Sequence, residues 1–205
     1  MKDEAIRRQA RRLLKQITQT KRPLDQRLLL AAAITKVMER APIVVGGTAE
    51  EYWAGGEYHA TDLGLCRTPS ERDVAAFRSI GLERKQRHWT AERLPVAVEF
   101  PGEGDDIERT VPLTVGGVSV LMISCEDLYL DRLRQSTAAW PREDTSFDGA
   151  FEIALTNFAR IDWDYVATRI DGEVRPNVRT AMRAANRRVR SRARRGLAKI
   201  TIGTS

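Results

Sequence analysis

Residues able to do chemistry are concentrated in one stretch, which reads Ile-Val-Val-Gly-Gly-Thr-Ala-Glu-Glu-Tyr-Trp over residues 43–53. Three β-prone residues end in Gly46 and Gly47, and Thr48 with Glu51 has the Ser/Thr-x-x-Glu spacing of a helix capping box. The pattern predicts a strand, a tight glycine turn and a helix. Because glycine has no side chain, a bound group can approach the backbone closely at this turn. The free N–H groups and the positive dipole end of the helix favour an anion there, most naturally a phosphate.

Two carboxylates follow on predicted strands. Residues 58–65 read as a strand that carries Asp62, and residues 94–100 as a strand whose apolar neighbours make Glu99 conspicuous. A carboxylate in an apolar run is costly unless it is paired, hydrogen-bonded or bound to a cation. Glu99 is therefore a candidate metal ligand. The alternative is an outward-facing side chain on a half-exposed strand.

This order of elements resembles the nucleotidyltransferase superfamily, whose signature is an apolar strand, Gly-Gly or Gly-Ser, a short helix and a strand bearing Asp-x-Asp. The resemblance implies that the turn Gly46-Gly47-Thr48 holds the phosphates of a nucleoside triphosphate (NTP), and that Asp62 and Glu99 bind Mg²⁺. Gly64 stands where the signature has its second aspartate. One carboxylate fewer weakens the hold on a hard cation. A single-metal site, a natural loss of activity and an engineered inactivation are all open explanations.

The segment 123–151 adds to the resemblance. It is similar to bacterial and archaeal nucleotidyltransferase-like proteins of the toxin or AbiEii-like kind, which carry Glu-Asp-Leu at the head of a helix, a basic residue five or six places on, and an Asp near the next helix start. The matching residues are Glu126-Asp127-Leu128, Arg132, and Asp144 or Asp148. The resemblance covers about residues 40–160. It implies that Arg132 balances charge near the nucleotide, unless Asp131 engages it in a salt bridge.

The C-terminal segment is the second functional feature. From Val174 to Ser205 there are ten basic residues and no acidic ones, so the rest of the chain carries a net charge of −4 against +6 for the whole. Pro176 suits a helix start. Beyond it one helical stripe is apolar (Val178, Met182, Ala185, Val189), while arginines repeat every four residues. Like charges at this spacing repel, and a phosphate backbone would relieve that repulsion.

RNA, with transfer RNA as one candidate, is therefore the expected partner of this helix. The arginines expected to contact it are Arg179, Arg183, Arg187, Arg190 and Arg194. Phosphate contacts should dominate because the segment lacks aromatic residues for base stacking. The alternative is that the helix docks on the mildly acidic body or on a partner subunit. The basic residues of the N-terminal helix are either a solvated face or a second nucleic-acid contact.

Composition limits the class of protein. The 205 residues are 42% hydrophobic and 30% charged, which is ordinary for a soluble globular protein. The two cysteines, Cys66 and Cys125, and the two histidines, His59 and His88, cannot form a Cys/His zinc set. Both cysteines are interpreted as reduced, in a cytoplasmic protein. The longest apolar run, residues 28–34, is too short to span a membrane.

The whole pattern predicts an α+β protein with a nucleotidyltransferase-like mixed β-sheet flanked by helices and with N- and C-terminal helical extensions. The expected segments are N-terminal helices in 1–41, an α/β core in 42–123, a helical part in 124–171, and the basic C-terminal helix and tail in 172–205.

Within the core, smaller signals locate further elements. Ser70 caps a predicted helix that ends near Ile80, before Gly81. A charged stretch that includes His88 and Trp89 is expected to be irregular. Residues 111–123 read as a hairpin turning at Gly-Gly.

These observations predict Mg²⁺-dependent transfer of a nucleotide from NTP to an RNA acceptor, by a protein that is a candidate toxin of a toxin–antitoxin pair. One alternative is a catalytically inactive nucleotidyltransferase fold that acts as a binding or antitoxin-like partner, which Gly64 favours. Another is a small DNA-binding protein whose arginine-rich helix enters a groove, although no helix-turn-helix signal accompanies it. No membrane partner is expected.

Overall fold

The computed structural model describes residues 2–56, 60–92, 94–138 and 144–203. The chain divides into two compact units, Met1–Glu51 with His59–Ile123, and Tyr52–Tyr58 with Ser124–Ser205. The N-terminal helices and the α/β core belong to the first unit. The helical part and the basic helix belong to the second.

The first unit is built on a mixed sheet of seven described strands in the order β3-β4-β5-β2-β1-β7-β6. The strands are β1 (Ile43–Val45), β2 (Asp62–Cys66), β3 (Glu83–Lys85), β4 (His88–Thr90), β5 (Ala97–Glu99), β6 (Thr110–Val115) and β7 (Val118–Ile123). β1 pairs parallel with β7 and β2 with β5, and the other neighbours pair antiparallel. This mixed sheet with its helices confirms the predicted α+β class.

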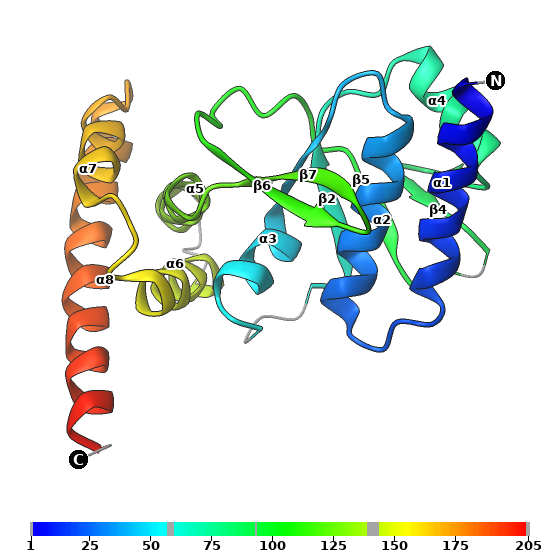
Figure 1. Ribbon diagram of the computed structural model, residues 1–205. Coiled ribbons are helices and arrows are strands. Elements are labelled where there is room, and N and C mark those ends of the chain that lie inside the picture. The colour runs from blue at the N-terminus through cyan, green and yellow to red at the C-terminus, as the bar shows by residue number, and fades with distance from the viewer. Residues whose placement is uncertain (1, 57–59, 93, 139–143, 204–205) are drawn as a thin grey trace. The chain divides into compact units, whose positions relative to one another are not determined.

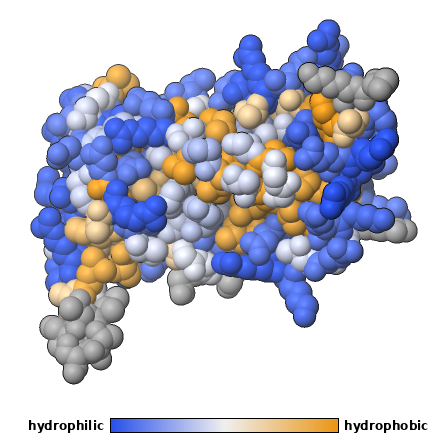
Figure 2. All heavy atoms as spheres, in the orientation of Figure 1, coloured by the Kyte–Doolittle hydropathy of each residue, from blue (hydrophilic) through white to orange (hydrophobic). Residues whose placement is uncertain are grey.

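Helices α1 (Lys2–Ile17) and α2 (Pro23–Val37) pack side by side, and α2 lies against the sheet (Figure 1). α1 is amphipathic: Leu13 and Ile17 are buried, while Arg8 and Arg12 are exposed. α2 contains the run Leu-Leu-Leu-Ala-Ala-Ala-Ile and is buried over most of its length. Figure 2, in the same orientation, shows hydrophilic residues where α1 lies and a hydrophobic area on the neighbouring surface. Among the described residues, no helix has both the length and the apolar character that crossing a membrane requires.

Two local predictions in this unit are confirmed. The Ser70 side chain accepts a hydrogen bond from the N–H of Asp73, whose carboxylate accepts from the N–H of Ser70, and this capping box starts α4 (Glu71–Ser79). Gly116 and Gly117, with φ of +56° and +77°, form the turn of the β6–β7 hairpin. Two consecutive positive φ angles are typical of the type I′ turn that suits a two-residue hairpin.

The stretch expected to be irregular is instead a hairpin at the edge of the sheet. β3 pairs antiparallel with β4, and Gln86 between them has φ of +57°. The prediction was wrong because β3 is Glu-Arg-Lys and fully exposed, so it lacks the apolar alternation that marks a half-buried strand. The neighbouring strands are also shorter than expected. β2 begins at Asp62, and residues 58 and 59 of the predicted strand lie outside the described residues.

The second unit is helical. It contains α5 (Cys125–Ala138), α6 (Asp144–Asn157), α7 (Trp163–Asp171) and α8 (Pro176–Gly203), and α8 packs on the other three. The predicted apolar stripe of α8 is buried: Val178, Met182, Ala185 and Val189. Tyr129 of α5 donates a 2.8 Å hydrogen bond to Oδ1 of Asn186 in this buried contact. The basic helix is therefore part of a packed core.

Candidate functional site

The alternation of β2 separates a core face from a half-exposed face of the sheet. Leu63 is fully buried, whereas Asp62 and Gly64 lie on the opposite face and are partly exposed. Pairing with β5 places Gly64 opposite Glu99, and pairing of β5 with β4 places Glu99 opposite His88. The half-exposed face therefore brings together side chains from three neighbouring strands.

Asp62, His88 and Glu99 form a cluster, called here the triad. One potential ligand atom from each residue lies within 4.8 Å of the others. Carboxylate oxygens and imidazole nitrogen are ligands for divalent metal ions. Ligand atoms bound at about 2.1 Å can be no more than about 4.2 Å apart. Shifts of less than about 1 Å, within reach of side-chain rotation, would therefore bring the three atoms around one ion.

Positive charge and open space lie beside Glu99. The Nε of Arg87 is 3.4 Å from Oε1 of Glu99, and the two side chains are 74% and 30% exposed. A cavity of about 270 Å³ is lined by Glu99, Arg87, Arg84 and Trp89, among others, but not by Asp62 or His88. An anionic group bound in this cavity would find the counter-charge of two arginines beside Glu99.

The glycine turn is open to an approaching ligand. α3 (Gly46–Trp53) begins directly where β1 ends, and Gly46 has φ of +63°. A Cβ built on Gly46 would meet no atom within 4 Å. The first N–H groups of an α-helix have no partner inside the helix. The expected anion cradle is thus not filled by protein atoms at Gly46.

Thr48 does not have the role expected of its side chain. α3 begins two residues earlier, at Gly46, so Thr48 lies within the first turn and is not the N-cap. Its side chain is fully buried, and its hydroxyl donates a 2.8 Å hydrogen bond to the carbonyl oxygen of Asp62. The capping-box prediction is therefore wrong at this helix. The bond instead joins α3 to β2 and leaves the backbone N–H of Thr48 as its contribution to a cradle.

A buried ion pair holds α3 in place. Arg27 of α2 and Glu51 of α3 are 2% and 5% exposed and pair directly. Nη1 of Arg27 donates to the carbonyl oxygen of Ala60 at 2.8 Å, and Oε2 of Glu51 accepts from the N–H of Ala60 at 3.0 Å. Ala60 lies two residues before Asp62. The pair therefore fixes the helix that begins at the glycine turn relative to the strand that carries Asp62.

Gly64 stands on β2 where the sequence resemblance predicts a second aspartate. A Cβ built there would lie 3.2 Å from the carbonyl oxygen of Val45 and 3.3 Å from its Cγ2. Val45 is the residue paired with Gly64 across β1 and β2. Any side chain at position 64 thus requires β1 to give by a few tenths of an ångström. The close contact with Val45 is therefore a steric reason for a glycine at this position.

Arg132 lies on α5, in the second unit, and is 8% exposed. Its Nη1 donates to Oδ2 of Asp131 at 3.1 Å and to Oε1 of Gln135 at 3.0 Å. The salt bridge with Asp131, the alternative to a phosphate contact, is therefore present.

The Glu-Asp pair at the head of α5 supports the packing of α7. Oε1 of Glu126 accepts from the N–H of Asp162, the N-cap of α7, at 3.1 Å. Oδ1 of Asp127 accepts from the hydroxyl of Tyr165 at 2.6 Å. Both carboxylates are buried, and their contacts explain the motif structurally.

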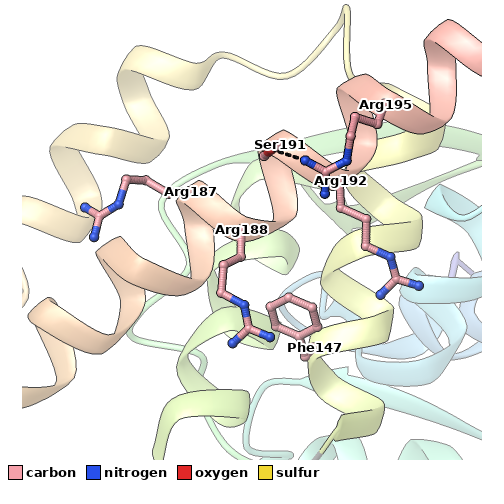
Figure 3. Close-up of a pocket in the computed structure, with 6 residues that line it drawn as sticks. All are labelled: Phe147, Arg187, Arg188, Ser191, Arg192 and Arg195. Atoms are coloured by element: carbon pink, nitrogen blue, oxygen red, sulfur yellow. Dashed lines mark hydrogen bonds between the residues drawn. The ribbon is translucent and has the colours of Figure 1, made fainter.

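Residues of α8 and α6 form a basic hollow of about 410 Å³. Its lining residues are Arg187, Arg188, Ser191, Arg192, Arg195 and Phe147 of α6 (Figure 3). Nη1 of Arg195 donates to the hydroxyl of Ser191 at 2.6 Å. The guanidinium groups of Arg188 and Arg192 lie 4.9 and 4.0 Å from the ring centres of Phe147 and Phe151. The aromatic rings missing from the C-terminal sequence are supplied by α6.

The five arginines expected to bind nucleic acid have different surroundings. Arg183 pairs with Asp171 at 2.8 Å, and Arg179 donates to the carbonyl oxygen of Glu173 at 3.2 Å. Arg190 and Arg194 lie over the rings of Trp163 and Phe158, and Arg187 lines the basic hollow. The hollow also includes Arg188, Arg192 and Arg195, which extend the charge of the helix in the sequence but were not among the five expected contacts.

His88 is a candidate that sequence reasoning missed. The sequence signal for a strand is the alternation of polar and aromatic residues in His-Trp-Thr, which matches the half-buried, buried and half-buried pattern of β4. Its position opposite Glu99 depends on strand pairing, which no local signal encodes.

No protein-family model matches the chain, and no curated protein sequence matches it. Among solved structures, the chain is similar to an antigenic nucleotidyltransferase-like protein from Paracoccidioides brasiliensis, with 14% sequence identity and a TM-score of 0.46, over 70% of this chain and 84% of that chain.

Proposed function

We propose that the protein transfers a nucleotide from an NTP to an RNA acceptor in a Mg²⁺-dependent reaction. The supporting observation is that ligand atoms of Asp62 and Glu99 lie within 4.8 Å of each other on one half-exposed face. The Thr48 hydrogen bond connects Asp62 to the helix that begins at the open Gly46 corner. A cation-binding pair of carboxylates next to an anion cradle is what an NTP with its metal ion requires.

In this reaction a hydroxyl oxygen of the acceptor attacks the α-phosphorus of the NTP. The new oxygen–phosphorus bond forms, the bond to the bridging oxygen breaks, pyrophosphate leaves, and the hydroxyl proton passes to water. A bound metal ion would neutralise phosphate charge. Asp62 and Glu99 would hold that ion, and the backbone N–H groups of Gly46 and Gly47 would donate hydrogen bonds to the β- and γ-phosphates. Positioning and charge neutralisation provide most of the rate acceleration in transfers of this kind.

The basic hollow supports RNA as the acceptor. Four arginines gather around it, and two of them are held over phenylalanine rings. Guanidinium groups fixed in this way lose less freedom when they bind phosphate. We extend the proposal to a cytoplasmic toxin that modifies transfer RNA and is held by an antitoxin or another partner subunit. That extension is supported by the sequence resemblance of residues 123–151.

A catalytically inactive fold that binds a partner is the second candidate. Gly64 favours it, because the triad has one carboxylate fewer than the signature and a side chain at this position is crowded by Val45. Tight binding of a partner without NTP would support this candidate.

The deciding experiment incubates the full chain with each labelled NTP, Mg²⁺ and total RNA. We expect label to enter RNA in wild type and to be lost with Asp62→Asn. Asp105→Asn is the matched control, since it removes the same charge at an exposed position. Background transfer from folded wild type with all four nucleotides would refute the enzymatic proposal.

RNA binding is tested by substitution, because removing α8 would uncover the buried contact between Tyr129 and Asn186. We expect Arg187→Glu with Arg195→Glu to lower RNA affinity and to reduce its salt dependence. Arg72→Glu on α4 is the control, because it makes the same reversal of charge at a single side chain outside the hollow, which is 86% exposed. Equal RNA affinity of all three proteins would exclude the hollow as the binding surface.

A further inference from the structure

We propose that the triad prefers a first-row transition-metal ion, with Mn²⁺ as the probe, over Mg²⁺, and that His88 is its third ligand. The inference rests on the proposed function and revises one part of it, since it names a transition-metal ion in place of Mg²⁺ as the ion that the site binds best. Ion binding itself can be measured without any nucleotide.

The strand pairing fixes the direction in which His88 points. On β4 the next residue, Trp89, is 4% exposed and packs edge-on against Phe77 with ring centres 5.0 Å apart. Because successive side chains of a strand point to opposite faces, burial of Trp89 turns His88 to the half-exposed face. There it pairs with Glu99 across the strands. His88 is therefore held beside the carboxylates by the core packing of its neighbour.

Gly64 explains why the third donor comes from β4. Position 64 lies between Asp62 on its own strand and Glu99 on the adjacent strand, so it is where a second β2 carboxylate would stand. A Cβ there would press on the backbone of Val45 at 3.2 Å. The donor missing from β2 is available from His88, whose ligand atom is within 4.8 Å of both carboxylates.

The donor set decides which ion the triad prefers. Mg²⁺ takes oxygen ligands in near-ideal octahedral geometry and dehydrates reluctantly. Imidazole instead suits transition metals, and Mn²⁺ accepts both carboxylate and imidazole ligands. One nitrogen and two oxygens on one side of an ion leave further positions open for water or phosphate. The triad thus fits Mn²⁺ better than Mg²⁺.

Arg87 is the charge that a bound ion has to replace. Its Nε lies 3.4 Å from Oε1 of Glu99, and its side chain is 74% exposed. The guanidinium offsets part of the negative charge of the triad in the absence of an ion. An exposed side chain can move into solvent when the ion binds, so breaking the Arg87–Glu99 ion pair costs little free energy. Arg87→Gln should consequently strengthen Mn²⁺ binding.

The test titrates the full chain with Mn²⁺ alone and follows the free ion by electron paramagnetic resonance. We expect one bound Mn²⁺ in wild type, with ¹⁴N coupling in the spin-echo spectrum, and displacement only by a large excess of Mg²⁺. His88→Ala should abolish the ¹⁴N coupling. It should also weaken Mn²⁺ binding by more than about tenfold, because loss of a residue that only supports a metal ligand already costs about 10–100-fold in affinity. His88→Asp should shift the preference toward Mg²⁺.

The wild-type spectrum keeps the test decisive even where a variant misfolds. Absence of ¹⁴N coupling in the bound Mn²⁺ spectrum would overturn the inference, as would equal Mn²⁺ affinity of wild type and folded His88→Ala. Glu83→Gln, at an exposed position on β3, is the control and should leave Mn²⁺ binding unchanged. Nitrogen-coupled Mn²⁺ without nucleotide transfer would uphold the inference and reject the proposed function. Mg²⁺-dependent nucleotide transfer that is unchanged in His88→Ala would uphold the proposed function and reject the inference.

Discussion

Substitution of Gly64 separates the steric reason for this glycine from the electrostatic one. The Cβ of Gly64→Ala would lie 3.2 Å from the carbonyl oxygen of Val45. Crowding of this kind costs about 1–3 kcal/mol. Replacing a strand glycine by alanine returns about 0.5–1 kcal/mol of backbone entropy. We therefore expect Gly64→Ala to lower the free energy of unfolding by about 1 kcal/mol.

Gly64→Asp has the same steric cost and adds a third carboxylate beside Asp62 and Glu99. Two unit charges 4 Å apart repel by about 1 kcal/mol in water and by about 4 kcal/mol at the effective dielectric constant of a protein surface. Because the triad is half-exposed, we expect a further loss of about 2 kcal/mol in the absence of a divalent ion. A bound ion removes this repulsion, so the variant should gain more stability from Mg²⁺ than wild type does.

The assay is urea denaturation of wild type, Gly64→Ala and Gly64→Asp, each with EDTA and with Mg²⁺. Gly64→Ala measures the steric cost alone and is the control for the aspartate. If Gly64→Asp loses the same free energy with EDTA as with Mg²⁺, the three carboxylates do not share an ion site. If neither variant is destabilised, the close contact with Val45 is refuted. Where the aspartate is accommodated, it restores the second acidic position, and Mg²⁺-dependent transfer should rise.

Three further predictions concern buried and paired groups. Glu51→Gln leaves the buried Arg27 charge without its partner, so the free energy of unfolding in urea should fall by about 3–5 kcal/mol; a change under about 1 kcal/mol would contradict the burial of the pair. Burial raises the pKa of the Cys125 thiol to about 12, so iodoacetamide at pH 8 should alkylate this thiol only after unfolding. Mass spectrometry can follow the alkylation, and rapid labelling of the native chain would contradict the prediction. The side-chain hydrogen bond of Arg175 lowers the pKa of Glu173 from 4.5 to about 2, so this carboxylate stabilises the fold above pH 4.5 and the contribution is lost as the pH falls toward 2. Thermal melting of Glu173→Gln should therefore depend less on pH over that range than melting of wild type.

Features encoded by a few neighbouring residues were predicted correctly. Ser70 caps α4, and Gly116-Gly117 makes the β6–β7 turn. The strand, glycine turn and helix at residues 43–53 are present as well. Each depends on backbone angles or on hydrogen bonds that span only a few residues, and these are what the sequence expresses directly.

Features that depend on pairing between distant segments could not be predicted in detail. His88 joins the carboxylates only because β4 pairs with β5, and the exposed residues of β3 gave no sign of that hairpin. Thr48 fits the capping pattern, but β1 leads directly into α3 at Gly46, and the Thr48 hydroxyl bonds to Asp62. Long-range partners override local preference at such positions.

The arginines of α8 were assigned from charge alone, which does not identify their partners inside the fold. Arg183 bonds to Asp171, and Arg192 both pairs with Asp148 at 3.2 Å and lies over Phe151. The apolar stripe was predicted correctly because it follows helical periodicity. Which arginines face outward depends on how the helix docks, and docking is a property of the whole unit.

The chain crosses between its two units more than once, because Tyr52–Tyr58 belongs to the second unit while the residues on either side belong to the first. Trp53 is 7% exposed, and its carbonyl oxygen accepts a 2.7 Å hydrogen bond from Nδ2 of Asn157. A cut after residue 123 would consequently leave this insert attached to the wrong fragment and would deprive the helical part of a buried tryptophan. Any experiment that expresses, swaps or fuses one half of the protein must first relocate those few residues, or study the chain intact.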